Sequence, residues 1–460
     1  MPFEMKKIMI TIALAMTMAG CSKFTEVDLP QDQITRDLIF KDEGLANSAM
    51  AGIYRSVESS GFLSGSSSGA QSYLSCYTDE LTSYAAAGSD NSQFFNLTHN
   101  ALTPTVNNLW TVSYNQIYNM NSMVEGMEQS TQLSQAFRQK LRGEALFLRA
   151  MVHLYLTNTY GDIPFISTTA YEQNQQVIRL PQTEVYAKIK ADLTQAAIDL
   201  PATLPKGSRV KPTKMAAYAL MARLAYYQEQ WDDAVRYSSL VINDVDYAIE
   251  TSIDRTFLKD SNSAIWQLMP STGTSATQQG NFFVLRTAPP ARVALSQDLI
   301  AGFEAGDQRR TKWVGEIKDS QGKTYYYPFK YKQFTVGTAS SEYSVVFRVE
   351  ELYLIRAEGY IQQGQPELAK NDLNKLRLRV GLSALTGIDQ DMLMAAVQKE
   401  RRYELFVEFG HRFYDLKHFK VIDQVMTAVK PNWKTTYQLL PVPEPEMLLN
   451  PNLNPQNNGY

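Results

Sequence analysis

The sequence predicts a mostly α-helical protein whose helices form a scaffold for long loops and a few short strands. Residues 134–159 carry apolar side chains at helical spacing, and residues 221–244 and 354–377 each resemble two helices around a short polar break. Strand-like alternation is confined to two short stretches. A chain of 460 residues, 44% of them hydrophobic, can bury a large core.

Charge and composition exclude several classes of protein. The net charge is −3, so the chain has no overall basic field to attract a nucleic-acid backbone. Charged residues make up only 20% of the chain, which argues against a wholly disordered protein. We therefore expect a folded protein with no nucleic-acid partner.

Residues 1–20 are predicted to be a lipoprotein signal peptide. Two lysines precede an apolar stretch over residues 8–18, which is too short to span a bilayer as a helix. The Met-Ala-Gly-Cys sequence that ends at Cys21 resembles a bacterial lipobox, in which the cysteine carries the lipid. We therefore expect lipidation at Cys21 and a lipidated tether over residues 21–42.

Cys76 is the only other cysteine. A single thiol cannot form an internal disulfide, so core packing must hold the fold together. We interpret Cys76 as a small buried hydrophobic residue and not as a nucleophile.

Three helices are predicted in the first part of the chain, over residues 47–59, 106–129 and 134–159. The last has two apolar stripes, formed by Leu141, Ala145, Leu148, Val152 and Tyr155 and by Phe147, Ala150 and Leu154. A helix that is apolar on two faces lies between other helices. In the 106–129 helix, Trp110, Tyr114 and Tyr118 recur every four residues and are expected to belong to the core.

Two later segments predict helix pairs that pack closely. Ala222 and Ala234 are twelve residues apart, as are Ala357 and Ala369, so small residues stand where two helices could touch. The pattern resembles tetratricopeptide helix pairs, which must stack on neighbours to bury their apolar faces.

Strands and loops are expected in between. Residues 264–269 and 323–334 have the alternation of short hairpins, whereas 85–96 and 270–281 have the composition of long loops. Loops of this length in a compact domain are usually functional or disordered.

Four segments, in this order, resemble the SusD/RagB family of bacterial outer-membrane lipoproteins. They are LRGEALFLRAMVHLYLTNTYGDIPFI (141–166), the helix pair and Arg-rich turn at 348–382, ERRYELFVEFGHRFYDL (400–416) and the Pro-rich ending at 439–460. His411 and Phe413 depart from the residues that many members have around a Trp. The resemblance implies a single helical domain over 43–460, with an N-terminal part at about 43–245 and a C-terminal part at about 260–460.

The resemblance also implies a function. Such proteins have tetratricopeptide-like pairs that support a loop-rich ligand face. They are lipid-anchored at the outer membrane of Bacteroidota-type bacteria and exposed at the cell surface, and they pass captured oligosaccharides to a SusC-like TonB-dependent transporter. The chain is therefore expected to bind glycans and not to be an enzyme. Two alternatives remain open: a peptide- or glycopeptide-binding lipoprotein of the same uptake system, and a surface glycoside hydrolase.

Aromatic residues in the predicted loops are candidates for sugar contacts. A flat ring can lie against the C–H face of a sugar while polar groups bind the hydroxyls. The candidate rings are Tyr73, Tyr77, Tyr84, Phe94, Phe95, Trp266, Trp313 and Tyr325.

Glu400, Glu404 and Glu408 could suggest a pair of catalytic carboxylates, because their spacing puts them on one helical face. However, Arg401, Arg402 and Arg412 are close in sequence, and a neighbouring cation lowers the pKa of a carboxyl group, whereas a general acid needs a raised pKa. We therefore interpret the three glutamates as a structural ion-pair network. The following Gly410 fits the C-terminal cap of their helix.

No metal or cofactor is predicted. The four histidines lack the spacing of a zinc site, and no G-x-S-x-G, G-x-G-x-x-G or P-loop motif occurs. A structural calcium ion could not be recognised, because loop oxygen ligands have no fixed linear pattern. The Pro-rich tail is expected to lie extended over the domain, docked by Leu439, Leu440, Leu449 and Tyr460.

Overall fold

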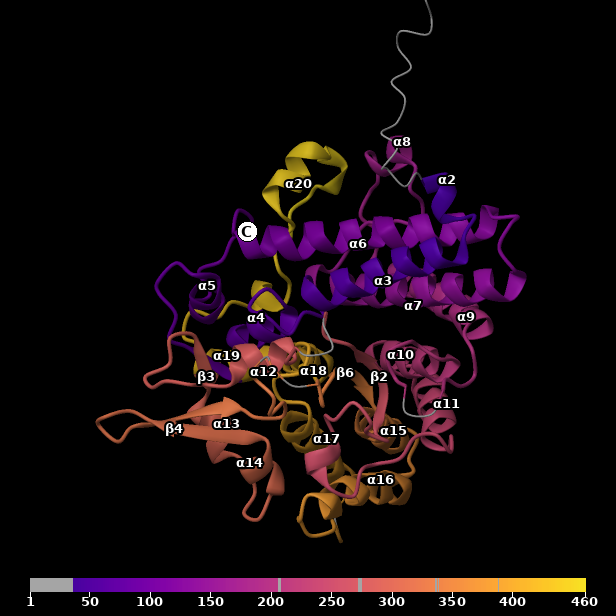
Figure 1. The fold of residues 1–460 in the computed structure, drawn as a ribbon. Helices are drawn as coiled ribbons and strands as arrows, with labels where there is room; N and C mark the ends of the chain where they lie inside the picture. Colours follow the sequence, from indigo (N-terminus) through magenta and orange to yellow (C-terminus); the bar gives the residue numbers. More distant parts are fainter. Residues whose placement is uncertain (1–35, 206–207, 272–274, 336, 338, 388) are drawn as a thin grey trace, which may run out of the picture.

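The computed structural model describes residues 36–460, except 206–207, 272–274, 336, 338 and 388. The predicted signal peptide, Cys21 and most of the predicted tether lie outside the described residues. Long helices occupy the upper part of the molecule, and shorter helices and two-stranded sheets lie below them (Figure 1). The predicted class, a mostly helical fold with few short strands, is confirmed.

The upper layer confirms the three helices predicted in the first part of the chain. Its helices are α2 (Arg36–Ile39), α3 (Glu43–Ser59), α6 (Pro104–Gln129), α7 (Gln135–Tyr160) and α9 (Gln182–Asp199). Helix α3 begins earlier than predicted because the Asp42 side chain caps it, accepting a hydrogen bond of 2.8 Å from the Leu45 N–H. Among the described helices, none is both long and apolar enough to cross a membrane.

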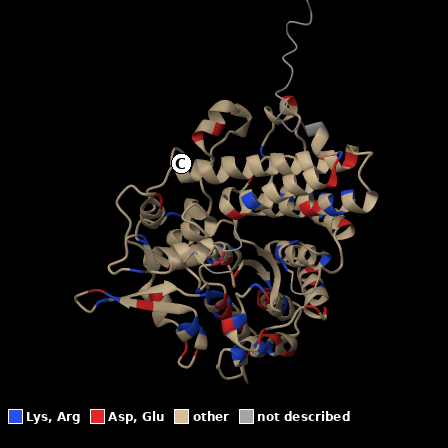
Figure 2. Ribbon diagram, viewed as in Figure 1, with Lys and Arg blue, Asp and Glu red and all other residues tan. Residues whose placement is uncertain are grey.

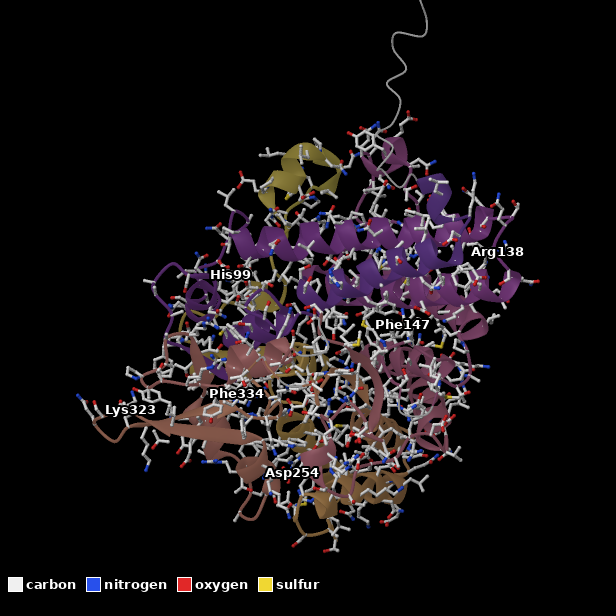
Figure 3. The ribbon with its side chains drawn as sticks, in the orientation of Figure 1. His99, Arg138, Phe147, Asp254, Lys323 and Phe334 are labelled. Atoms are coloured by element: carbon white, nitrogen blue, oxygen red, sulfur yellow. The ribbon has the colours of Figure 1, made fainter. Side chains whose placement is uncertain are left out.

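Helix α7 is the centre of this layer. Both of its predicted stripes are buried, and the helix packs against α6 and α9. Phe147, which lies in the interior in Figure 3, is fully buried. The interpretation of α7 as a helix between helices is confirmed.

The predicted helix pairs are also present. They are α10 (Lys214–Tyr227) with α11 (Trp231–Ile242), and α15 (Val349–Gln362) with α16 (Pro366–Arg379). All four alanines singled out in the sequence are fully buried. The pairs stack through α11 and α15, where a Cβ on Gly359 would be 2.6 Å from Val235 Cγ2. Each pair thus buries the face that it could not bury alone.

The strands form three antiparallel pairs among the described residues. They are β1 (Leu81–Ser83) with β3 (Val293–Leu295), β2 (Ala264–Leu268) with β6 (Ser344–Arg348), and β4 (Val314–Lys318) with β5 (Thr324–Pro328). Strands were expected at 264–269 and 323–334, and both are present. The hairpin expected at 264–269 is wrong, because β2 pairs with β6, which lies far along the chain.

Two segments predicted as loops contain short helices. They are α5 (Asp90–Asn96) and α12 (Gln278–Phe283). Helix α5 packs on α4 (Ala70–Tyr77), and α12 begins where the Thr277 hydroxyl accepts a hydrogen bond of 3.1 Å from the Gly280 N–H. Tertiary contacts and capping thus override a composition typical of loops.

Gly410 does not end the glutamate-bearing helix. Helix α17 (Gln390–Glu404) ends six residues earlier, and Gly410 precedes α18 (His411–His418) with a φ of 78°. A Cβ at Gly410 would be 2.5 Å from Leu74 Cδ1, so the position also requires glycine for close packing. The predicted C-terminal cap is wrong.

The tail is docked by most of the expected residues. Leu440 is fully buried, and the Tyr460 hydroxyl donates a hydrogen bond of 3.1 Å to the Leu439 carbonyl. Leu449 was expected to dock the tail but is 81% exposed, at the end of the short helix α20 (Glu444–Leu449). The remaining short helices are α8 (Tyr171–Asn174), α13 (Gln297–Ala301), α14 (Gln308–Lys312) and α19 (Ile422–Val429).

Candidate functional site

Five of the eight candidate rings belong to the core. Tyr73, Tyr77, Phe94, Trp266 and Trp313 are all at least 95% buried. They pack on one another and on neighbouring rings, as Trp266 does edge-to-face on Phe147 with the centroids 5.1 Å apart. A ring without an accessible face cannot stack on a sugar, so these five are structural in this conformation. Tyr73 and Tyr77 on α4 pack against Phe94 on α5, Trp266 lies on β2, and Trp313 packs edge-to-face on Phe257.

Two other candidates, Tyr84 and Tyr325, are brought together. Tyr84 follows β1 and is 38% exposed, whereas Tyr325, on β5, is as buried as the five core rings. Their rings meet edge-to-face, with centroids 5.5 Å apart and an interplanar angle of 80°. The backbone N–H of Tyr84 donates a hydrogen bond of 2.7 Å to the Arg292 carbonyl. Tyr325 thus packs against the accessible ring of Tyr84, and the hydrogen bond holds the Tyr84 backbone in place.

Charged groups surround this ring pair. The Tyr325 hydroxyl donates to Asp319 over 3.2 Å, and the Lys323 ammonium lies 5.1 Å from the centre of the Tyr325 ring. Lys323 is at the end of the β4–β5 hairpin, which projects from the molecule (Figure 3). We call Tyr84, Tyr325, Asp319, Lys323 and the exposed Arg292 the Tyr84 surface. It combines a ring with hydrogen-bonding groups of both charges.

Phe95, the last candidate, is half-buried beneath Lys430. The Lys430 ammonium lies 4.7 Å from the Phe95 ring centre and donates to the carbonyls of Phe95, over 2.9 Å, and of Cys76. Cys76 is fully buried, and burial raises the pKa of its thiol to about 12. The interpretation of Cys76 as a small buried residue is confirmed.

Lys430 should make stability depend on pH. Burial lowers its pKa to about 7, from 10.5 for an exposed lysine. Between these values the unfolded chain retains a proton that the folded protein has released, so the free energy of unfolding rises with pH. From pH 7 to pH 9 we expect urea denaturation to show a rise on the order of 2 kcal/mol larger in the wild type than in Lys430→Met. Equal pH profiles would contradict this assignment.

The three glutamates form a buried ion-pair network, as predicted. Glu404 accepts from Arg348 and Arg379 over 2.5 Å each and lies 3.1 Å from Arg309. Burial opposes ionisation of Glu404, but Arg379, Arg348 and Arg309 outweigh it and hold its pKa well below the usual value. A carboxyl group held ionised in this way is unsuited to act as a general acid.

The partners of the network differ from those expected. Besides the contacts of Glu404, Glu400 pairs with Arg309 and Arg377, and Glu408 pairs with Arg348 and Lys330. The arginines near the glutamates in sequence bind elsewhere: Arg401 pairs with Asp415, and Arg402 and Arg412 pair with Asp79. Strand β6 and helices α14 and α16 supply the arginines of the network.

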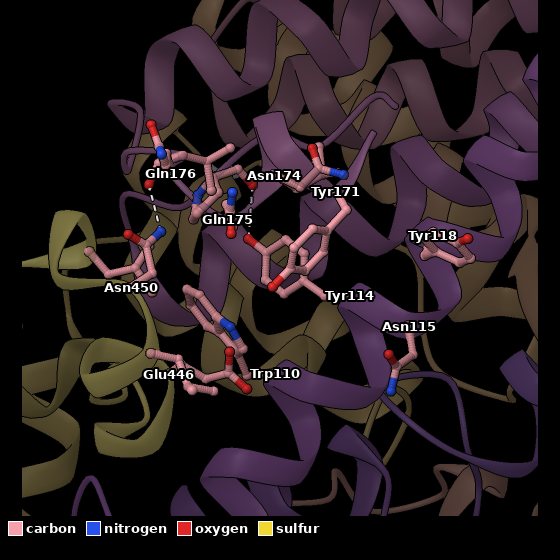
Figure 4. A pocket seen from close by; sticks show the side chains of 15 residues that line it. Trp110, Tyr114, Asn115, Tyr118, Tyr171, Asn174, Gln175, Gln176, Glu446 and Asn450 are labelled. Atoms are coloured by element: carbon pink, nitrogen blue, oxygen red, sulfur yellow. Dashed lines mark hydrogen bonds between the residues drawn. The ribbon is translucent and has the colours of Figure 1, made fainter. Parts of the chain in front are cut away.

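Helices α6 and α20 and the 171–177 segment border a cavity of about 570 Å³, which we call the α6–α20 cavity (Figure 4). Trp110, Tyr114 and Tyr118 line it, although they were expected to be core residues. Trp110 is indeed 98% buried, but Tyr118 is 51% exposed. The four-residue spacing puts all three on one face of α6, and it could not indicate that this face borders a cavity.

Metal ligands do not gather in the described part of the chain. Within residues 36–460, apart from the gaps given above, no group of three or more His, Cys, Asp or Glu side chains could hold a metal ion.

Comparison with known proteins gives matches over most of the chain. A family model described as "Starch-binding associating with outer membrane" matches residues 48–226, and one described as "SusD family" matches residues 313–460. SusD-like protein P2 of Formosa agariphila is 26% identical, and the alignment covers 99% of this chain and 100% of that protein.

Solved structures share the fold. A SusD superfamily protein from Bacteroides vulgatus superposes with a TM-score of 0.80 at 21% identity, covering 92% of this chain and 100% of that one. A laminarin-binding SusD-like protein gives a TM-score of 0.76 at 21% identity, covering 91% and 100%. At these identities the likeness shows that the fold is shared.

Proposed function

The chain belongs to the SusD family, and on that premise we propose that it captures oligosaccharides and leaves them chemically unchanged. The observation that carries the proposal is the Tyr84 surface, where an accessible ring stands among charged hydrogen-bonding groups. The laminarin-binding relative, which has the same fold, supports a glycan as the ligand.

The geometry indicates how a sugar would be held. Its C–H face would lie on the accessible ring of Tyr84, whose orientation the edge-to-face contact with Tyr325 fixes. Lys323 and Arg292 would donate hydrogen bonds to sugar hydroxyls, and Asp319 would accept them. Affinity would then come from ring contact and hydrogen bonds, with no bond formed or broken.

Calorimetry with a panel of oligosaccharides and peptides tests the proposal. Tyr84→Ala should weaken the binding of the best glycan by at least about tenfold, or about 1.4 kcal/mol, because it removes the ring face. The matched variant Tyr84→Phe keeps the ring and should retain most of the affinity. Tight peptide binding without any glycan response would contradict the proposal and favour a peptide-binding lipoprotein.

We also propose a lipid anchor on Cys21, attachment to the outer membrane with exposure at the cell surface, and delivery to a SusC-like TonB-dependent transporter. Outer-membrane association is supported by the description of the family model that matches residues 48–226. Radiolabelled palmitate should be incorporated into the wild type and not into Cys21→Ala, and the variant should leave the membrane fraction. If Cys21→Ala carries no palmitate but stays in the membrane fraction, the proposal that a lipid on Cys21 anchors the protein is wrong.

A further inference from the structure

We propose that the α6–α20 cavity is a second carbohydrate site, distinct from the Tyr84 surface, and that it takes short neutral oligosaccharides. The inference rests on the proposed function for the class of ligand. In Figure 1, α8 and α20 lie above α6, whereas the strands that carry the Tyr84 surface lie below it. The two sites therefore use different elements on different parts of the molecule.

The size and lining of the cavity fit a sugar ligand. About 570 Å³ lies within the range of small-molecule sites, which is about 300–1,000 Å³. Aromatic rings and side-chain amides border the same space from three segments of the chain (Figure 4). These are the two kinds of group that sugar recognition needs, one for the C–H face and one for the hydroxyls.

Two tyrosines leave large ring surfaces at the cavity. Tyr171 on α8 is 76% exposed, and Tyr118 on α6 is 51% exposed. Leu449, at 81% exposed, adds an apolar contact from α20. Exposed apolar side chains that gather at one cavity mark a binding site more clearly than the same residues scattered singly.

The floor of the cavity is fixed by its own contacts. The Trp110 ring packs on Tyr114 with the centroids 5.0 Å apart, and the Tyr114 hydroxyl donates to the Pro164 carbonyl over 2.8 Å. The Asn450 amide donates to the Val177 carbonyl over 2.8 Å and so joins the tail to the segment after α8. A ligand would thus meet the Tyr114 ring, which the buried Trp110 beneath it already holds in place, and this reduces the entropy lost on binding.

Several polar groups remain available at the rim. The side chains of Asn115, Gln175 and Gln176, and the hydroxyls of Tyr118 and Tyr171, make no hydrogen bond to another described residue. Amides and hydroxyls can both donate and accept, as sugar hydroxyls do. These groups can therefore replace the water that a sugar loses on binding.

Charge selects the class of sugar. Among the described residues that line the cavity, Glu446 is the one charged side chain, and it accepts a hydrogen bond of 2.9 Å from Thr111. Charged residues are sparse along α6 and abundant around α14–α17 (Figure 2). A sulfate or uronate would meet the Glu446 carboxylate and no lining cation, so its desolvation would go uncompensated. Neutral sugars avoid this cost.

The test uses the full-length protein carrying Tyr84→Ala, which weakens the first site. Calorimetry then compares neutral oligosaccharides (laminarihexaose, maltohexaose, cellohexaose) with acidic ones (oligogalacturonate, sulfated oligosaccharides) and with peptides. We expect residual binding of at least one neutral oligosaccharide. Adding Tyr171→Ala should weaken this binding at least tenfold, whereas Ile198→Ala, a similarly exposed apolar residue on α9, should change nothing. Trp110→Phe should remove part of the ligand-induced change in tryptophan fluorescence.

Four results would overturn the inference. If Tyr84→Ala abolishes all glycan binding, or Tyr171→Ala has no effect, the cavity is not a sugar site while the proposed function stands. If acidic oligosaccharides or peptides bind in a Tyr171-dependent way, the ligand class is wrong. If the wild type binds no glycan at all, the proposed function fails as well.

Discussion

Replacing Glu404 by glutamine should lower the free energy of unfolding by about 3–5 kcal/mol, the usual cost of breaking a buried ion pair. The amide keeps the shape of the side chain but removes the negative charge that faces Arg309, Arg348 and Arg379. These guanidinium groups are 97–99% buried and cannot turn to water for compensation. Urea denaturation followed by circular dichroism measures the loss.

A surface ion pair provides the matched control. Glu316 lies 3.8 Å from Arg310, and its side chain is 56% exposed. Because solvent screens such a pair, Glu316→Gln should cost at most about 1 kcal/mol. A similarly small loss for Glu404→Gln would show that the remaining glutamates neutralise the arginines without it, and the network would then not depend on its central carboxylate.

Trp266→Ala should cost about 3–5 kcal/mol of stability, because it leaves a large cavity in the core. Trp266 is fully buried on β2, and its ring packs on Phe147. Its indole N–H has no hydrogen-bond partner among the described residues, so the expected loss comes from packing. Thermal and urea denaturation should both show the change.

A second substitution of Trp266 tests whether its ring stabilises the core or contacts the ligand. Trp266→Phe keeps an apolar ring in the core and should leave glycan affinity unchanged, whereas Tyr84→Ala should reduce affinity with little loss of stability, because the side chain is 38% exposed. If Trp266→Phe weakened glycan binding while the fold stayed intact, the ring would have to become accessible in the bound state. That outcome would restore the sequence-based prediction.

The reliable predictions were those that depend on local periodicity. Helix α7 and the two helix pairs follow from apolar and small residues at helical spacing, and such spacing fixes which face is buried. The ion-pair network was also predicted correctly in kind, because three acidic side chains in one helical region need cations. Its partners were not, since Arg309, Arg348, Arg377 and Lys330 come from segments distant in the chain.

The candidate rings show where such reasoning stops. Phe94 lies in a segment whose composition suggested an exposed loop, yet this segment forms α5 and packs on α4. Trp266 lies in a segment that seemed too short to be buried, yet this segment forms β2 and pairs with β6. Conversely, Tyr118 was assigned to the core by its spacing, although its face of α6 borders an open cavity. Periodicity identifies a face of a helix but not what that face meets.

By itself, the sequence determined the helical class, the repeated helix pairs, the burial of Cys76 and the family. Only the tertiary structure decided which rings are accessible, which arginines hold the glutamates, and that Trp110 and Glu446 border one cavity. The physical reason is that secondary structure follows from contacts within a few residues along the chain. Exposure and pairing instead depend on how distant segments pack, and many different pairings are compatible with the same local pattern.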